Sequence, residues 1–170
     1  NSQLKLPYDL ARELPVGHYA RKNVGYLVAI AQGAESIYET DDDNAPLQNW
    51  SPRKRDCGAQ LVTAEGWVNA YQYFTSERIW PRGFPLDAIT ASLELSRPTQ
   101  REATVMPSPI QQGLANGSPD VDAVWRLVMD APFEFDDAVS VCLPTGAWCP
   151  FNSQSTWWWP DAYPLMYLPS

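Results

Sequence analysis

Apolar residues recur with a helical period close to the start of the chain. Four of them stand at i, i+3, i+4 and i+7 and form one stripe of an amphipathic helix: Val24, Leu27, Val28 and Ala31. Gly33 follows at the position where a glycine often ends a helix in a left-handed conformation. The pattern predicts a helix over residues 22–32.

The next segment, ESIYET, alternates between polar and apolar residues and predicts a strand at about 35–40. It runs directly into three aspartates, residues 41–43. Two unit charges ~4 Å apart repel by about 1 kcal/mol in water and by about 4 kcal/mol at an effective dielectric constant of 20. A positive group must therefore offset the repulsion, unless the turn is fully solvated. Two interpretations stay open: a solvated acidic turn, and a ligand site at the end of a strand.

A second helix is predicted over residues 119–129. Ser118 fits the N-cap, Pro119 the first helical position, and Asp120 the first turn, where the helix dipole favours an anion. The expected buried stripe consists of Val121, Val124, Trp125 and Val128. Asp122 is a further carboxylate near the same helix start, and a capping role is its structural alternative.

Prolines, glycines and aromatic residues dominate the rest of the chain. They predict a loop with a solvated basic cluster at 53–55, then short strands and tight turns over residues 65–89. Gly83 suggests a backbone bend that presents Arg82, for which a surface salt bridge is the local alternative. Near the end, VSVCL predicts a strand and Pro-Thr-Gly a turn. Three consecutive tryptophans, 157–159, cannot all face one core, so at least one is expected to be exposed or to line a cleft.

Composition narrows the class of protein. The chain has 170 residues, 45% of them apolar, enough for one domain with a real core, and a formal net charge of −8. That charge argues against nucleic acid and anionic membranes as partners. No apolar run approaches a membrane span, and the first residues contain no signal-peptide core. Three cysteines without a C-x-x-C pair and one histidine favour a reducing, cytoplasmic setting and exclude His-cluster metal sites.

Four ordered blocks resemble a known family: ARKNVGYLVAIAQGAESIYETDDDN, IWPRGFPLDAI, GSPDVDAVWRL and WCPFNSQSTWWWPDAYPLMYLP. Together they resemble the STELLO-type glycosyltransferases and, more distantly, the reversibly glycosylated polypeptides, the UDP-arabinopyranose mutases. The resemblance covers residues 21–169. It implies a GT-A-like α/β fold with a mixed sheet, and a single glycosyltransferase domain over residues 1–170. Only about 40 residues precede the aspartates, so we expect a fragment of a longer chain that lacks part of the N-terminal Rossmann-like half.

The resemblance also implies a chemistry for the aspartates. A nucleotide diphosphate leaves as a multiply charged anion, and Mn²⁺ or Mg²⁺ held by carboxylates neutralises that charge. Asp43 is expected to coordinate the metal directly, Asp41 to reach it through water or to bind the ribose, and Asp42 to take either role if the segment turns early. The cation would also offset the repulsion between the carboxylates.

Further roles are expected for residues in the other blocks. Arg21 and Lys22, at the start of the first helix, are expected to contact the diphosphate. Asp122 and Arg82 are the catalytic candidates, with Asp122 contacting or deprotonating the acceptor hydroxyl. The expected partners are a nucleotide diphosphate sugar, in particular a UDP-sugar, and an acceptor that the sequence does not identify. A eukaryotic relative would be expected in the Golgi lumen.

Other classes of protein stay open. A metal-dependent phosphohydrolase or nucleotidyltransferase also gathers aspartates at a sheet edge, and a non-catalytic sugar-binding relative would keep the same motifs. A calcium loop of the EF-hand type is excluded, because its sixth position requires glycine and Pro46 stands there, counting from Asp41.

Overall fold

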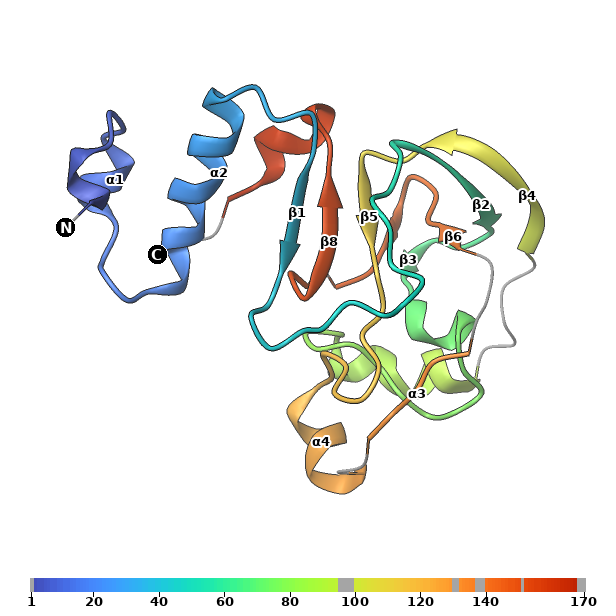
Figure 1. The fold of residues 1–170 in the computed structure, drawn as a ribbon. Coiled ribbons are helices and arrows are strands. Elements are labelled where there is room, and N and C mark those ends of the chain that lie inside the picture. Colours follow the sequence, from blue (N-terminus) through green and yellow to red (C-terminus); the bar gives the residue numbers. More distant parts are fainter. Residues whose placement is uncertain (1, 95–99, 130–131, 137–139, 151, 168–170) are drawn as a thin grey trace.

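Three small sheets and several helices make up the part of the chain that the structure describes. The computed structural model describes residues 2–94, 100–129, 132–136, 140–150 and 152–167 (Figure 1). The α-helices are α1 (Leu10–Glu13), α2 (Lys22–Ala31), α3 (Leu86–Glu94) and α4 (Ala123–Met129), and the 3-10 helices are η1 (Gln3–Lys5), η2 (Tyr19–Arg21), η3 (Ala70–Tyr73) and η4 (Pro160–Leu165). The strands are β1 (Ile37–Thr40), β2 (Asp56–Val62), β3 (Gly66–Trp67), β4 (Gln100–Pro107), β5 (Ile110–Gln112), β6 (Val141–Cys142), β7 (Ala147–Trp148) and β8 (Ser155–Trp158).

The first sheet, in the order β1-β8-β5, carries the aspartates at one end. Both strand pairs are antiparallel, and Thr40 at the end of β1 lies opposite Ser155 at the start of β8. The residues that precede β8 therefore lie beside the turn that follows β1. In Figure 1, α2 lies alongside this sheet. The predicted helix at 22–32, the predicted strand and the position of the aspartates at its C-terminal end are confirmed, and Gly33 has the expected positive φ of 78°.

The three consecutive tryptophans are all buried, so none of them is the exposed ring that the sequence allowed. That one of them lines a cleft stays a prediction. Alternation along β8 directs Trp158 to one face of the sheet and its two neighbours to the other. Trp157 stacks on Tyr38 at a centroid distance of 4.6 Å and on Trp50 at 6.1 Å. The sheet is covered on both faces, by α2 on one and by the loop containing Trp50 on the other, which is why all three rings are buried.

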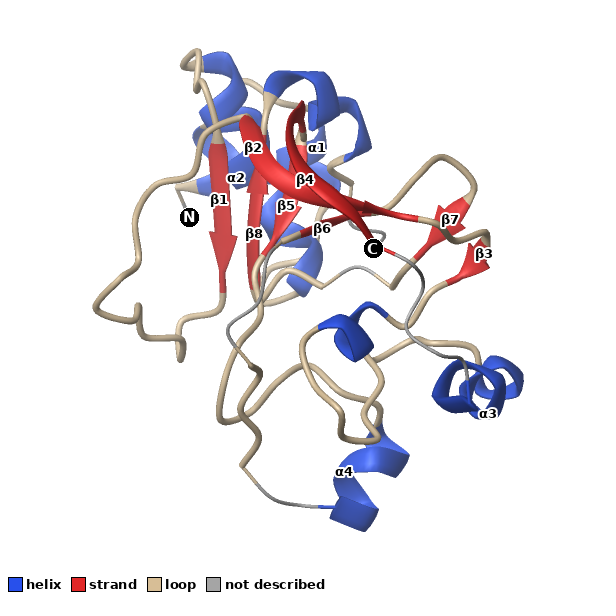
Figure 2. Ribbon diagram, turned by 90° about the vertical axis from the view of Figure 1, so that its right-hand side faces the viewer, coloured by secondary structure: helices blue, strands red, loops and turns tan. Residues whose placement is uncertain are grey.

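The second sheet, in the order β4-β2-β6, is mixed: β2 pairs antiparallel with β4 and parallel with β6. A third, parallel pair joins β3 and β7. In Figure 2 these strands lie in the upper part of the molecule, and α3 and α4 lie in the lower part. The chain is thus an α/β protein with a mixed sheet, as the sequence predicts.

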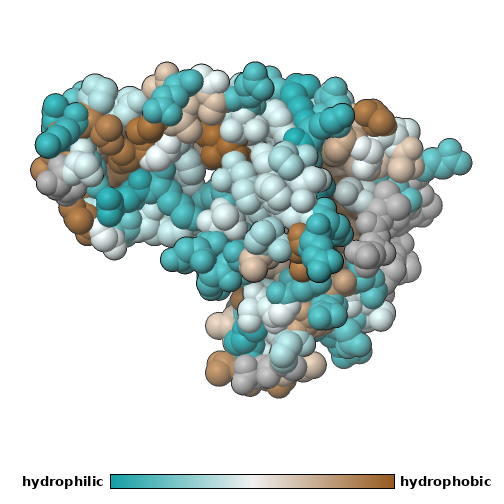
Figure 3. All heavy atoms as spheres, in the orientation of Figure 1, coloured by the Kyte–Doolittle hydropathy of each residue, from teal (hydrophilic) through white to brown (hydrophobic). Residues whose placement is uncertain are grey.

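The second predicted helix is shorter than expected. It begins at Ala123, whereas the pattern placed its start at Pro119. Val121 instead forms an antiparallel bridge with Pro81, so the preceding residues are extended and Asp120 is not in a helical turn. The predicted stripe is only half correct: Val121 and Trp125 are buried, whereas Val124 and Val128 are 53% and 74% exposed. Figure 3 shows apolar side chains at the lower tip of the molecule, where Figure 1 places α4.

Candidate functional site

The aspartates form a tight turn at the end of β1. The amide of Asn44 donates to the carbonyl of Asp41 at 3.3 Å, which places Asp42 and Asp43 at the exposed centre of the turn. The side chains of Thr40 and Asn44 both donate to the carbonyl of Gln154, at 3.1 and 2.6 Å. The turn is therefore fixed to the loop that precedes β8, and its carboxylates are presented to solvent at a defined place.

Lys22 supplies the positive charge that the acidic turn requires. Its ammonium lies 3.2 Å from Glu39 Oε1 and 3.7 Å from Asp41 Oδ1. Alternation along β1 places Glu39 and Asp41 on the same side, toward α2, and the first turn of α2 places Lys22 above them. The carboxylate repulsion is thus offset by a residue of the chain itself.

Glu39 is the buried member of this group, with a side chain only 5% exposed. It also accepts a hydrogen bond of 2.5 Å from the hydroxyl of Tyr26. Burial works to lower the pKa of Lys22, but the charge of Glu39 and its hydrogen bond, with a smaller contribution from Tyr19, raise the pKa above its ordinary value. Lys22 is therefore held as a cation beside Asp41.

The loop of residues 152–154 joins the site to α2. Lys22 donates to Ser153 Oγ at 3.3 Å, and the hydroxyl of Tyr19 forms a short hydrogen bond with the same atom. The ammonium of Lys22 also lies 4.7 Å from the centre of the Tyr19 ring. Ser153 thus links η2, α2 and the loop, a role that no sequence pattern indicated.

The same loop joins the acidic turn to residues 118–120. The side chain of Gln154 donates to the carbonyl of Ser118 at 3.1 Å, while its own carbonyl accepts from Asn44. Gln154 therefore bridges the DDDN turn and the PDVDA block, although these segments are about 75 positions apart in the sequence. Two of the blocks that carry the family resemblance meet at this bridge.

Arg82 and Asp120 form an ion pair next to this bridge. Arg82 Nη2 lies 2.8 Å from Asp120 Oδ1, and the Arg82 amide donates to the Asp120 carbonyl at 3.1 Å. Gly83 has a φ of 80°, so the predicted bend that presents Arg82 is confirmed. Burial raises the pKa of the Asp120 carboxyl; the charge of Arg82 opposes this shift, and the negative charge of Asp41 adds to it.

Asp122 has a different environment from Asp120. Its carboxylate accepts a hydrogen bond of 2.8 Å from the amide of Val124, and its carbonyl accepts from the amide of Arg126. This is the capping role that the sequence offered as the structural alternative. The catalytic role of Asp122 stays a prediction, and Asp120 is the carboxylate that sequence reasoning missed.

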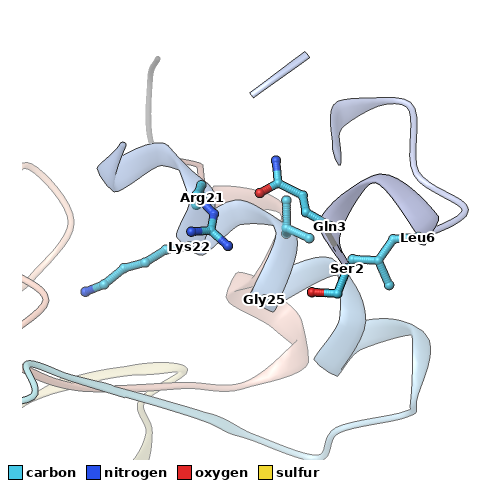
Figure 4. A pocket seen from close by; sticks show the side chains of 7 residues that line it. Ser2, Gln3, Leu6, Arg21, Lys22 and Gly25 are labelled. Atoms are coloured by element: carbon cyan, nitrogen blue, oxygen red, sulfur yellow. The ribbon is translucent and has the colours of Figure 1, made fainter. Parts of the chain in front are cut away.

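Arg21 and Lys22 follow one another at the start of α2. Both line a hollow of about 470 Å³, together with Ser2, Gln3 and Leu6 of the N-terminal segment and Val24 and Gly25 of α2. Figure 4 shows the ammonium of Lys22 directed away from this hollow. The two residues that the sequence grouped thus line one hollow, while the ammonium of Lys22 reaches the acidic turn. Their role as contacts of a diphosphate stays a prediction.

The carboxylates of the acidic turn are possible oxygen ligands for a metal ion, but they do not form a complete metal site. Within the described ranges, no three His, Cys, Asp or Glu side chains are grouped so that they could hold a metal. Mg²⁺ is often bound by one or two carboxylates, with substrate phosphates and water as the remaining ligands. The roles of Asp41 and Asp43 as ligands of such a cation stay predictions.

Comparison with known proteins finds relatives that match almost the whole chain. Two proteins of Arabidopsis thaliana, named probable glycosyltransferase STELLO2 and probable glycosyltransferase STELLO1, are each 31% identical to it over 191 aligned residues. The alignment covers 99% of this chain and 24% of each relative, so the chain spans about a quarter of their length. The chain is thus similar to these proteins over almost its whole length, which confirms the resemblance to the STELLO type drawn from the four sequence blocks.

No protein-family profile matches the chain. In the part of the chain that the structure describes, no helix has the length and apolar character needed to cross a bilayer.

Proposed function

We propose that this chain forms the nucleotide-sugar-binding part of a metal-dependent glycosyltransferase with a GT-A-like fold. The observation that carries the proposal is the convergence at the end of β1, where the DDD turn meets Lys22, the 152–154 loop and the Arg82–Asp120 pair. The similarity over 99% of the chain to proteins named probable glycosyltransferases supports the reaction class.

The reaction requires negative charge to be stabilised as the diphosphate leaves. A bound Mn²⁺ or Mg²⁺ would supply that stabilisation, with Asp43 as a direct ligand and Asp41 acting through water or on the ribose. Lys22 contacts Asp41 from the side of α2. In this proposal its ammonium would also contact the diphosphate. The donor proposed here is a UDP-sugar.

Titration calorimetry with a panel of UDP-sugars, with and without Mn²⁺, tests the proposal. We expect wild type to bind at least one donor more tightly with Mn²⁺, and Asp41→Ala and Asp43→Ala to lose that enhancement. Asp9→Ala is a matched control, because it also removes one carboxylate but lies beside α1 with a fully exposed side chain. No Mn²⁺-dependent binding to any donor in wild type would overturn the proposal.

A second assay separates transfer from hydrolysis. A phosphohydrolase would release free sugar or sugar phosphate from the donor at the same rate with or without saccharides as acceptors. A transferase releases nucleoside diphosphate faster when a suitable saccharide is present and forms a glycosylated product. Measuring both products in the same reaction mixture by mass spectrometry decides between these classes.

A further inference from the structure

The carboxylate of Asp120 has different partners from that of Asp122. Its side chain is 18% exposed, it is paired with a guanidinium at 2.8 Å, and its backbone is fixed at both sides. Tyr71 donates to the Asp120 carbonyl at 2.9 Å, and the neighbouring Val121 pairs with Pro81. Asp120 is therefore held in one position by contacts on its backbone and its side chain.

The position of Asp120 relative to the acidic turn follows from the bridge made by Gln154. The carbonyl of Gln154 accepts from the side chain of Asn44, the last residue of the turn. Its side-chain amide donates to the carbonyl of Ser118, two residues before Asp120. Through this bridge the acidic turn and the segment that carries Asp120 are held to one another, although they come from different parts of the chain.

We propose that Asp120 is the catalytic base that faces the acceptor, and that Arg82 is its positioning residue. The inference rests on the proposed function. The acceptor hydroxyl oxygen forms a bond to the anomeric carbon, the bond from that carbon to the diphosphate oxygen breaks, and the nucleoside diphosphate leaves with the electron pair. The proton of the hydroxyl passes to the carboxylate of Asp120. A partly buried carboxylate retains a proton better than a fully solvated one does, which suits this step.

Arg82 has a different role from Asp120. Its side chain is 72% exposed, and its guanidinium contacts Asp120 from the turn at Gly83. It sets the orientation and charge of the carboxylate without being buried in the site. Replacing Arg82 should therefore lower the rate and leave donor affinity nearly unchanged.

The test needs no knowledge of the natural acceptor, because water and simple methyl glycosides can serve as probes. Release of nucleoside diphosphate from the UDP-sugar that wild type binds best is measured with Mn²⁺, and donor affinity is measured by calorimetry. Asp120→Asn preserves the shape of the side chain, so we expect the melting temperature to stay close to that of wild type and the donor affinity to stay within about twofold. The release rate should fall by about 100-fold or more.

Matched variants separate the possible outcomes. Asp122→Asn should lose less activity than Asp120→Asn, and the reverse order would overturn the inference. Arg82→Gln should lower the release rate at unchanged donor affinity, and Arg82→Lys should restore part of it; equal rates in all three proteins would contradict the positioning role. Donor binding by wild type without any nucleoside diphosphate release would refute the role of Asp120 and leave the donor site standing. Absence of donor binding would refute both proposals.

Discussion

The ion pair between Lys22 and Glu39 makes a sharp prediction about stability. The substitution Lys22→Met keeps most of the aliphatic stem and removes the ammonium. Glu39, whose side chain is 5% exposed, then loses its contact with Lys22 and keeps the hydrogen bond from the hydroxyl of Tyr26. A buried carboxylate without its cation is costly, because it has lost its hydration and gains no opposite charge in return.

The size of the effect follows from distance and exposure. At 3.2 Å and an effective dielectric constant of 20, the gross attraction between Lys22 and Glu39 is about 5 kcal/mol. Removing one partner of a fully buried pair costs about 3–5 kcal/mol. Lys22 is 30% exposed, so water replaces part of its contribution, and we expect a loss of about 2–3 kcal/mol. For a chain of this size, that loss corresponds to a fall of about 5–10 °C in melting temperature.

A double-mutant cycle isolates the pair. Urea unfolding is measured for wild type, Lys22→Met, Glu39→Gln and the double variant, with Lys54→Met as a control for the loss of an exposed lysine. We expect the double variant to be more stable than the sum of the two single losses by at least about 1 kcal/mol, because it leaves no unpaired buried charge. Additive losses, or a Lys22→Met variant as stable as the control, would refute the argument.

Three further predictions concern the surrounding structure. Gly83→Ala should destabilise the protein by about 1–2 kcal/mol in urea unfolding, because φ is 80° there, and an unchanged midpoint would contradict the bend. Burial raises the pKa of Tyr71 above its usual range and raises the pKa of Tyr73 to about 12. The stability that these tyrosines confer is therefore fully present below about pH 10 and is lost as pH rises through their pKa values in the folded protein. Absorbance at 295 nm should therefore show some tyrosines ionising only together with unfolding; ionisation of all of them near pH 10 in the folded protein would disagree. Trp157→Ala should cost about 3–5 kcal/mol, since this buried ring stacks on Tyr38 and Trp50, and a loss below about 1 kcal/mol would speak against the aromatic packing.

The local sequence pattern was sufficient to predict the helix and the strand that hold the acidic turn. The helical stripe and Gly33 predicted α2, the alternation in ESIYET predicted β1, and the Pro-Thr-Gly turn also forms as expected, with the Ala147 amide donating to the Pro144 carbonyl at 3.1 Å. These signals depend on residues a few positions apart. Local propensity and tertiary structure agree there.

Sequence reasoning failed where long-range packing decides the conformation. Ser118, Pro119 and Asp120 form a good helix start on local grounds, yet pairing between Val121 and Pro81 keeps this segment extended. The helix begins after Asp122, which supplies an N-cap of its own. Asp120 was therefore assigned to a helix terminus, whereas in the structure it is the partner of Arg82.

Glu39 and Gln154 were missed for different reasons. Alternation along β1 was sufficient to place Glu39 on the same side as Asp41, but nothing local marked it as buried beside Lys22. Gln154 acts through contacts to Asn44 and Ser118, and both contacts depend on the pairing of β8 with β1. A bridge between segments so far apart in the chain leaves no periodic signal.

The role of Asp43 is the most direct test of the donor site. Asp43 lies at the exposed centre of the turn, and among the described residues no side-chain hydrogen bond to its carboxylate is seen. The substitution Asp43→Ala removes one of three neighbouring negative charges, so stability should hold or rise slightly. Mn²⁺-dependent binding of the nucleotide diphosphate should be lost.

The decisive measurement combines the melting temperature with Mn²⁺-dependent UDP binding for wild type and Asp43→Ala. We predict an unchanged or slightly higher melting temperature and loss of the Mn²⁺-dependent affinity. A purely structural turn predicts that Asp43→Ala keeps the Mn²⁺-dependent affinity of wild type. A variant that still binds UDP with Mn²⁺ as wild type does would contradict the site proposed here.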